Sequence, residues 1–135
     1  MGSLVIDIGG SCAKMMWTCD AITTLIHFSQ INDYYATTVE ICDIIESIKT
    51  FNYSDLKVCV SGGGAHRLRD SIKRLTDYII VGEFDCIVKG VRTYAIQSNA
   101  IPSNEDKLLV NIGTGVSFIK VSSESYVRLG GTSIG

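Results

Sequence analysis

The stretch that most limits the folds open to this chain is residues 4–14, which read LVIDIGGSCAK. The apolar run predicts a β-strand over Leu4–Ile8, and the glycine pair behind it predicts a tight turn. Glycines let the backbone approach an anion closely, so that N–H groups of the turn can face a phosphate. Ser11 adds a hydroxyl, Lys14 adds a mobile cation, and Asp7 can hold a metal ion through water. The stretch therefore predicts a phosphate-binding hairpin.

A second stretch repeats this order of residue types near the end of the chain. Residues 108–115 read LLVNIGTG, again an apolar run followed by a polar residue and a glycine-rich turn. Two such hairpins in one chain are typical of an internal duplication. We expect a nucleotide to be clamped between two related lobes.

Composition limits the classes of protein to which the chain can belong. Its 135 residues are 46% hydrophobic and 19% charged, with a formal net charge of -2. These values indicate a globular protein and argue against a nucleic-acid-binding surface, which needs a basic face. No apolar run approaches the roughly 20 residues of a membrane span, and the first residues do not resemble a signal peptide. We therefore expect a cytoplasmic protein that contacts neither membrane nor nucleic acid.

The five cysteines are odd in number and contain no C-x-x-C pair. Most lie in apolar runs, which favours small buried apolar side chains in a reducing compartment over a disulfide or a metal site.

Apolar periodicity predicts an alternation of strands and helices. Three strands at Leu4–Ile8, Lys14–Cys19 and Ile22–Phe28 form an antiparallel meander. Thr37 and Glu40 have the spacing of a capping box, which predicts a helix over about residues 38–51.

The prediction continues beyond this helix in the same alternating order. A strand at Lys57–Val60 leads into the glycine turn Ser61–Gly64 and a second helix, and a strand at Tyr78–Val81 leads into a third helix that begins near Glu83. The order βββαβαβα followed by a second βββ indicates an α/β fold with a mixed sheet. A polar link at Ser98–Asp106 predicts two lobes, residues 1–105 and the opening hairpins of an incomplete lobe at 106–135.

Four stretches in this order resemble one family. They are IDIGGS at residues 6–11 with Lys14, SGGGA at 61–65, EFDCIVKG at 83–90, and LVNIGTGVS at 109–117 with Arg128 and the GTS run at 131–133. The pattern resembles eukaryotic-type (type II) pantothenate kinases, within the actin-like ATPase and sugar-kinase superfold, whose lobes are ribonuclease H-like. The likeness covers nearly the whole chain but only about the first half of a family member.

The resemblance implies an enzyme that uses ATP and Mg²⁺ to phosphorylate pantothenate to 4'-phosphopantothenate, in coenzyme A biosynthesis. Glu83 would orient the substrate hydroxyl, while Arg128 and Lys14 would stabilise charge on the transferred group. Thr114, Ser117 and Arg128 would contact pantothenate. The metal residue would be Asp7, and the nucleotide-binding residues would be Asp7, Gly9, Gly10, Ser11, Lys14, Asn111, Gly113, Thr114 and Gly115.

The family also implies a homodimer and feedback inhibition by acyl-coenzyme A. Because the likeness stops at about half of a family member, this chain is expected to be inactive alone.

Simpler interpretations remain open for each element. The glycine turns at residues 9–11 and 113–115 can each belong to an ordinary hairpin, and Glu83 or Asp85 can be a helix cap. Arg128 can pair with Glu124 across a solvated hairpin, and the basic stripe that includes Arg67 can be a solvated helix face. Two other functions also stay open: a non-catalytic remnant or partner-binding subunit of the same fold, and another sugar kinase or actin-like ATPase.

Overall fold

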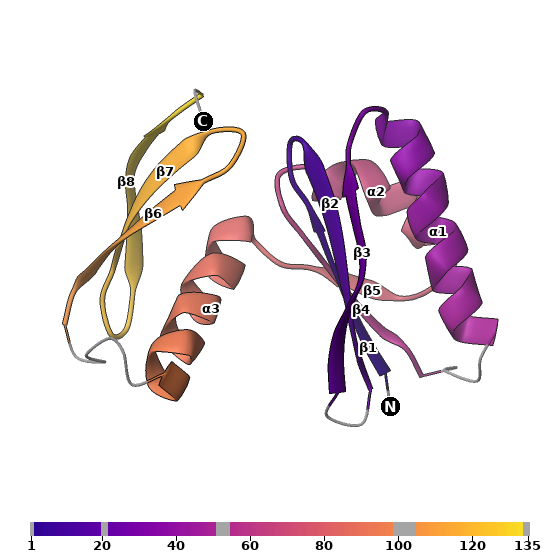
Figure 1. Ribbon diagram of the computed structural model, residues 1–135, viewed down its shortest axis with the longest axis horizontal. Coiled ribbons are helices and arrows are strands. Elements are labelled where there is room, and N and C mark those ends of the chain that lie inside the picture. The colour runs from indigo at the N-terminus through magenta and orange to yellow at the C-terminus, as the bar shows by residue number, and fades with distance from the viewer. Residues whose placement is uncertain (1, 20–21, 51–54, 99–104, 134–135) are drawn as a thin grey trace. The chain divides into compact units, whose positions relative to one another are not determined.

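The computed structural model describes residues 2–19, 22–50, 55–98 and 105–133. It divides into two compact units, Met1–Gly82 and Glu83–Gly135, each of which is described by itself (Figure 1). In both units, the strands and helices follow from apolar side chains that recur at the spacing of one buried face.

The first unit is built on a five-stranded sheet with the strand order β3-β2-β1-β4-β5. An antiparallel meander is formed by β1 (Gly2–Ile8), β2 (Cys12–Cys19) and β3 (Ile22–Gln30). Two further strands run parallel, β4 (Lys57–Ser61) to β1 and β5 (Tyr78–Ile80) to β4. Because β1 lies at the centre, Asp7 is paired with Lys14 on one side and with Ser61 on the other.

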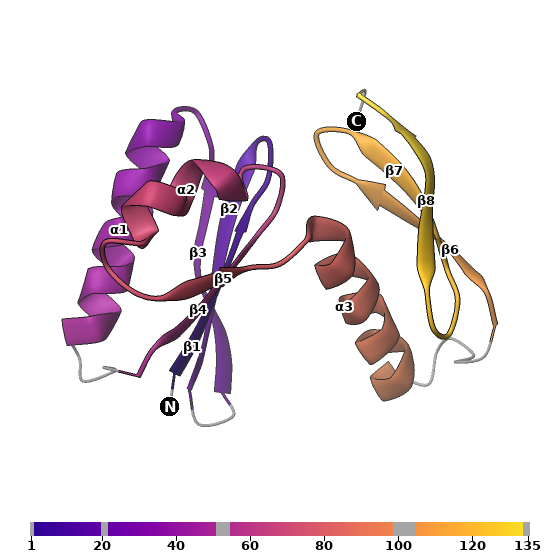
Figure 2. The same cartoon turned by 180° about the vertical axis from the view of Figure 1, so that it is seen from behind.

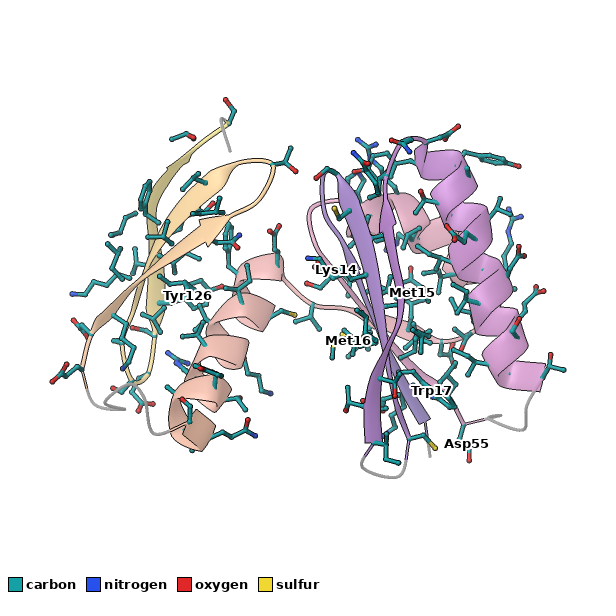
Figure 3. All side chains as sticks on the ribbon, viewed as in Figure 1. Lys14, Met15, Met16, Trp17, Asp55 and Tyr126 are labelled. Atoms are coloured by element: carbon teal, nitrogen blue, oxygen red, sulfur yellow. The ribbon has the colours of Figure 1, made fainter. Side chains whose placement is uncertain are left out.

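Two helices, α1 (Tyr34–Thr50) and α2 (Ala65–Ile72), cover the same face of this sheet (Figure 2). Side chains alternate along each strand, so every second residue points toward the helices. Met15 is fully buried in the core, whereas its neighbour Met16 is exposed on the opposite side (Figure 3). The core of the unit includes Leu4, Ile6, Ile8, Met15, Ile41, Ile45, Leu68 and Ile72.

The predicted capping box of the first helix is wrong. Helix α1 begins at Tyr34, and Thr37 lies inside it with its hydroxyl donating to the Asp33 carbonyl oxygen at 2.9 Å. The cap is Asp33, whose Oδ1 accepts a hydrogen bond from the backbone N–H of Tyr35 at 2.7 Å. An Asp in this position satisfies one of the N–H groups that a helix start leaves without a partner.

The second unit places one helix on a three-stranded antiparallel sheet. Helix α3 (Glu83–Ser98) is followed by β6 (Lys107–Ile112), β7 (Val116–Val121) and β8 (Tyr126–Thr132), which pair in that order. Its core joins Val88 of the helix to Ile119 and Val121 of β7. Within the second unit, the alternate side chains of the strands are exposed and largely apolar, at Leu108, Val110, Phe118, Val127 and Leu129.

The predicted fold class is confirmed, because the elements follow the order βββαβαβα and then βββ. The proposed lobe boundary between residues 105 and 106 stays a prediction; by packing, α3 groups with the second sheet. The five cysteines are each partly exposed, so the expectation that they are buried is wrong. In the described part of the chain, no helix is long and apolar enough to cross a membrane.

Candidate functional site

The first glycine turn is a tight hairpin between β1 and β2. The Gly9 N–H donates to the Cys12 carbonyl oxygen at 2.9 Å, which leaves Gly10 and Ser11 at the tip. The Ser11 carbonyl oxygen accepts the N–H of Ile31 at 2.7 Å, so the segment after β3 holds the tip from one side. Both tip residues are exposed, as an anion-binding turn requires.

Asp7 and Lys14 flank this turn as direct cross-strand neighbours. Lys14 Nζ lies 3.2 Å from Asp7 Oδ2, and the two side chains are 49% and 41% exposed. An exposed ion pair of this kind contributes about 0–1 kcal/mol to stability, so a ligand can displace it at little cost. The predicted phosphate and metal residues therefore lie together and are accessible.

The second glycine turn, Ser61–Gly64, lies beside the first because β4 runs parallel to β1. The Gly64 N–H donates to the Ile8 carbonyl oxygen at 2.9 Å. Gly62 has a φ of 94°, and a Cβ there would lie 2.2 Å from the Ile8 carbonyl oxygen and 2.7 Å from Asp7 Oδ1. Only glycine permits this approach, which brings the turn against the Asp7 carboxylate.

Tyr34 and Arg67 join this site although sequence reasoning did not find them. The Tyr34 hydroxyl lies 2.9 Å from the Gly9 carbonyl oxygen and 3.3 Å from that of Gly10. Arg67 Cζ lies 4.0 Å from the centroid of the Tyr34 ring. Arg67 is exposed, as expected for a solvated helix face, and its guanidinium also lies over an aromatic ring of this site.

A second group of predicted residues lies in the other unit. Arg128 Nη2 lies 3.5 Å from Ser117 Oγ, and Arg128 Cζ lies 5.3 Å from the centroid of the Phe84 ring. A Cβ on Gly131 would lie 2.4 Å from the Val116 carbonyl oxygen and 2.9 Å from Arg128 Nη2, so the close approach of β7 requires the glycine, and the guanidinium lies beside it. Glu83 is the first residue of α3 and precedes Phe84 directly. The structure thus brings Arg128 and Ser117 together and places the start of α3 beside them.

The turn between β6 and β7 carries the remaining predicted residues. The Gly113 N–H donates to the Gly115 carbonyl oxygen at 2.8 Å, and Thr114 is exposed at the tip. Asn111 lies directly across the hairpin from Ser117. A Cβ on Gly115 would lie 2.6 Å from the Thr132 carbonyl oxygen, which explains the glycine at that position.

Asp85 has a partner that its sequence position did not suggest. The Tyr126 hydroxyl donates to Asp85 Oδ1 at 2.6 Å, which links the first turn of α3 to β8 (Figure 3). This hydrogen bond is the main cause that raises the pKa of Tyr126 above its ordinary value. The pair holds the start of α3, and with it Glu83, on the sheet.

The donor set at Asp7 fits a magnesium ion. Mg²⁺ is usually held by one or two carboxylates together with substrate phosphates, not by a cage of protein ligands. Among the described residues, no cluster of three or more His, Cys, Asp or Glu could hold a metal ion. One partly exposed carboxylate beside the Gly9–Ser11 turn fits a metal that arrives with a nucleotide.

A comparison with protein families decides to which of them the chain is related. The family model described as Fumble matches residues 3–135. The chain belongs to the Fumble family. It is 24% identical over 173 residues to a pantothenate kinase of Schizosaccharomyces pombe, covering 98% of this chain and 43% of that protein. It is 33% identical over 130 residues to a type II pantothenate kinase of Bacillus cereus, covering 96% of this chain and 44% of that protein.

The chain thus spans less than half the length of these Fumble relatives. Among solved structures, it is similar to MreB5 of Spiroplasma citri bound to ADP, with a TM-score of 0.55 and 13% identity. That match covers 93% of this chain and 50% of MreB5. It is also similar to Lmo2764, a putative N-acetylmannosamine kinase from Listeria monocytogenes, with a TM-score of 0.55 and 17% identity, over 94% of this chain and 49% of that protein. These likenesses show the fold, which the chain shares with MreB5 and this putative sugar kinase.

Proposed function

We propose that this chain carries the phosphate-binding part of a pantothenate kinase, which transfers the γ-phosphoryl group of ATP to the hydroxyl of pantothenate. The observation that carries the proposal is the Gly9–Ser11 turn, flanked by the Asp7–Lys14 pair, in a chain of the Fumble family. The two curated relatives described above are named as pantothenate kinases, which supports pantothenate as the acceptor.

The first unit supplies the groups that hold the nucleotide. N–H groups of the Gly9–Ser11 turn and the Lys14 ammonium would bind the phosphates, because fixed dipoles and a cation offset their negative charge. Asp7 would hold the magnesium ion through water. The bound ion supplies charge neutralisation to the phosphates.

The second unit supplies the groups proposed for the acceptor and the transferred phosphoryl group. Glu83 would accept a hydrogen bond from the pantothenate hydroxyl and orient it, which suits the loose transition state of phosphoryl transfer. Arg128 would stabilise the charge that develops on the moving group. Thr114 and Ser117 would bind the pantothenate end. In the turn between β6 and β7, Asn111, Gly113, Thr114 and Gly115 would hold the transferred phosphate of the nucleotide.

Binding of Mg·ATP to the chain, measured by isothermal titration calorimetry, tests the nucleotide site. We expect saturable binding that Lys14→Ala weakens, whereas Lys49→Ala, which removes an exposed lysine of α1, leaves it unchanged. Equal binding by all three proteins would contradict the role of the turn.

Phosphorylation of radiolabelled pantothenate by a fusion of this chain to the remaining part of the Bacillus cereus relative tests the acceptor, with N-acetylmannosamine as the competing sugar substrate.

Three further properties belong to the same proposal and are carried by the family alone. They are a homodimer, inhibition by acyl-coenzyme A and a cytoplasmic location.

A further inference from the structure

We propose that Tyr34 is a positioning residue that holds the Gly9–Ser11 turn in the orientation that binds phosphate. The inference rests on the proposed function, since it assigns the turn to a polyphosphate. It concerns a residue that lies 24 positions beyond the turn and outside all of the glycine-rich stretches.

The peptide units of the turn determine the direction in which its N–H groups point. The described peptide bonds contain no cis form, and in a planar trans peptide the N–H points opposite to the C=O. The Tyr34 hydroxyl lies 2.9 Å from the Gly9 carbonyl oxygen and 3.3 Å from the Gly10 carbonyl oxygen. Its single proton is therefore shared between the two carbonyl oxygens, and the hydrogen bond to Gly9 is the shorter one. The N–H groups of Gly10 and Ser11 belong to these two peptide units and are therefore directed away from Tyr34.

This arrangement matches the requirement of an anion-binding turn. Successive N–H groups that converge on one side form a concave site for a phosphate oxygen. A glycine-rich turn can rotate its peptide planes easily, because glycine has few steric limits. A single donor that binds both carbonyls removes this freedom and leaves the N–H groups set for a ligand on the opposite side.

The surroundings of Tyr34 fix the direction of its hydroxyl. A Cβ on Gly64 would lie 3.2 Å from Tyr34 Cε1, so the second glycine turn packs against the edge of the ring. The Arg67 guanidinium covers the ring at 4.0 Å. Tyr34 is also the first residue of α1, whose start Asp33 caps. The ring is therefore held by the Ser61–Gly64 turn, by Arg67 of α2 and by the start of α1. Because these contacts fix the ring, they also fix the position from which its hydroxyl binds the Gly9–Ser11 turn.

The test uses Tyr34→Phe in the full chain and inorganic tripolyphosphate as the probe. Loss of one hydroxyl that orients two N–H groups should weaken tripolyphosphate binding about three- to tenfold. The midpoint of thermal unfolding should fall by only a few degrees, because one hydrogen-bonding hydroxyl is lost and the core is unchanged. The control is Tyr35→Phe, which removes a hydroxyl from a neighbouring side chain that is 79% exposed. In ¹⁵N spectra, the Gly10 and Ser11 amide signals should shift with tripolyphosphate in the unchanged chain and in Tyr35→Phe.

Each outcome decides the inference. A weaker affinity in Tyr34→Phe alone, with altered Gly10 and Ser11 amide signals in a variant that still unfolds cooperatively above the temperature of the binding experiment, supports it. Equal affinity in the unchanged chain and both variants overturns the role of Tyr34 and leaves the proposed function in place. Failure of the unchanged chain to bind tripolyphosphate and to shift these two amides overturns the inference together with the proposed phosphate site.

Discussion

At the residue scale, the site depends on glycines whose roles differ, although the sequence presents them alike. Gly62 is required by a φ of 94° and by the approach of the Ile8 carbonyl oxygen and the Asp7 carboxylate. Gly90, in α3, has no described atom within 4 Å of the position that a Cβ would occupy. Sequence reasoning could predict that Ser61–Gly64 forms a turn, but only the packing of β4 against β1 shows which glycine admits no side chain.

Gly62→Ala should lower the free energy of unfolding of the first unit by about 2 kcal/mol or more, because alanine adds both a left-handed backbone strain and a steric clash. Gly90→Ala is the matched control and should raise the stability of α3 by about 0.5–1 kcal/mol, since alanine favours a helix interior. Urea unfolding followed by circular dichroism measures both changes. Equal and small changes in the two variants would contradict the contacts described at Gly62.

Glu83→Gln should reduce pantothenate phosphorylation by more than about tenfold in the fusion to the remaining part of the Bacillus cereus relative, because an amide orients the acceptor hydroxyl less well than a carboxylate. Binding of Mg·ATP should be unchanged, since Glu83 is not among the residues proposed to bind the nucleotide. Turnover equal to that of the unchanged fusion would remove Glu83 from the mechanism. Asp85→Asn provides the comparison, since Asp85 is a neighbouring carboxylate whose proposed role is structural.

At the scale of elements, apolar periodicity predicted the eight strands and three helices that the described residues form, because it marks the face of each element that packs on its neighbours. The start of α1 was missed for a local reason. The pair Thr37 and Glu40 has capping-box spacing, but Asp33 lies one turn earlier and its carboxylate caps the helix. The start of α3 at Glu83 was predicted correctly. Its attachment to β8 was not, because Asp85 and Tyr126 are separated by 41 positions along the chain.

The hydrogen bond between Tyr126 and Asp85 predicts a dependence on alkaline pH. Because the folded chain raises the pKa of Tyr126, this pair contributes stability that is present below the ordinary tyrosine pKa of about 10 and is lost as the pH rises through the higher folded value. Absorbance at 295 nm should show one late-titrating tyrosine in the folded chain that is missing in Tyr126→Phe. The stability of Tyr126→Phe should fall less than that of the unchanged chain between pH 9 and pH 11, and an equal loss would contradict the pairing.

At the scale of the whole molecule, the links that complete the candidate site connect residues far apart in the chain. The Tyr34 hydroxyl donates to the Gly9 carbonyl oxygen, and the guanidinium of Arg128 in β8 lies over the ring of Phe84 in α3. Sequence patterns report local spacing, so they could name the turns and charged residues of the site but not the aromatic side chains that hold them. The open apolar face of the second sheet follows from the same alternation that builds its core.

This face predicts self-association of the chain. Phe118 and Val110 are direct cross-strand neighbours on it, and 37% and 42% of their surfaces are exposed. Exposed apolar patches on a sheet promote contacts between molecules. Phe118→Lys should shift the chain toward the monomer in sedimentation velocity, whereas Gln97→Lys, which makes the same charge change on an exposed position of α3, should not. A single monomeric species for the unchanged chain would contradict this prediction.

The ion pair between Asp7 and Lys14 has a consequence for how a nucleotide would arrive. Each partner already neutralises the other, so Mg·ATP would exchange their mutual contact for two new ones and would not meet a bare cation. Dissolved salt screens the old contact as well as the new ones. The affinity for Mg·ATP should therefore decrease only slightly as the ionic strength rises. Without the Asp7 carboxylate, Lys14 would be an unpaired cation, and the affinity would depend strongly on ionic strength.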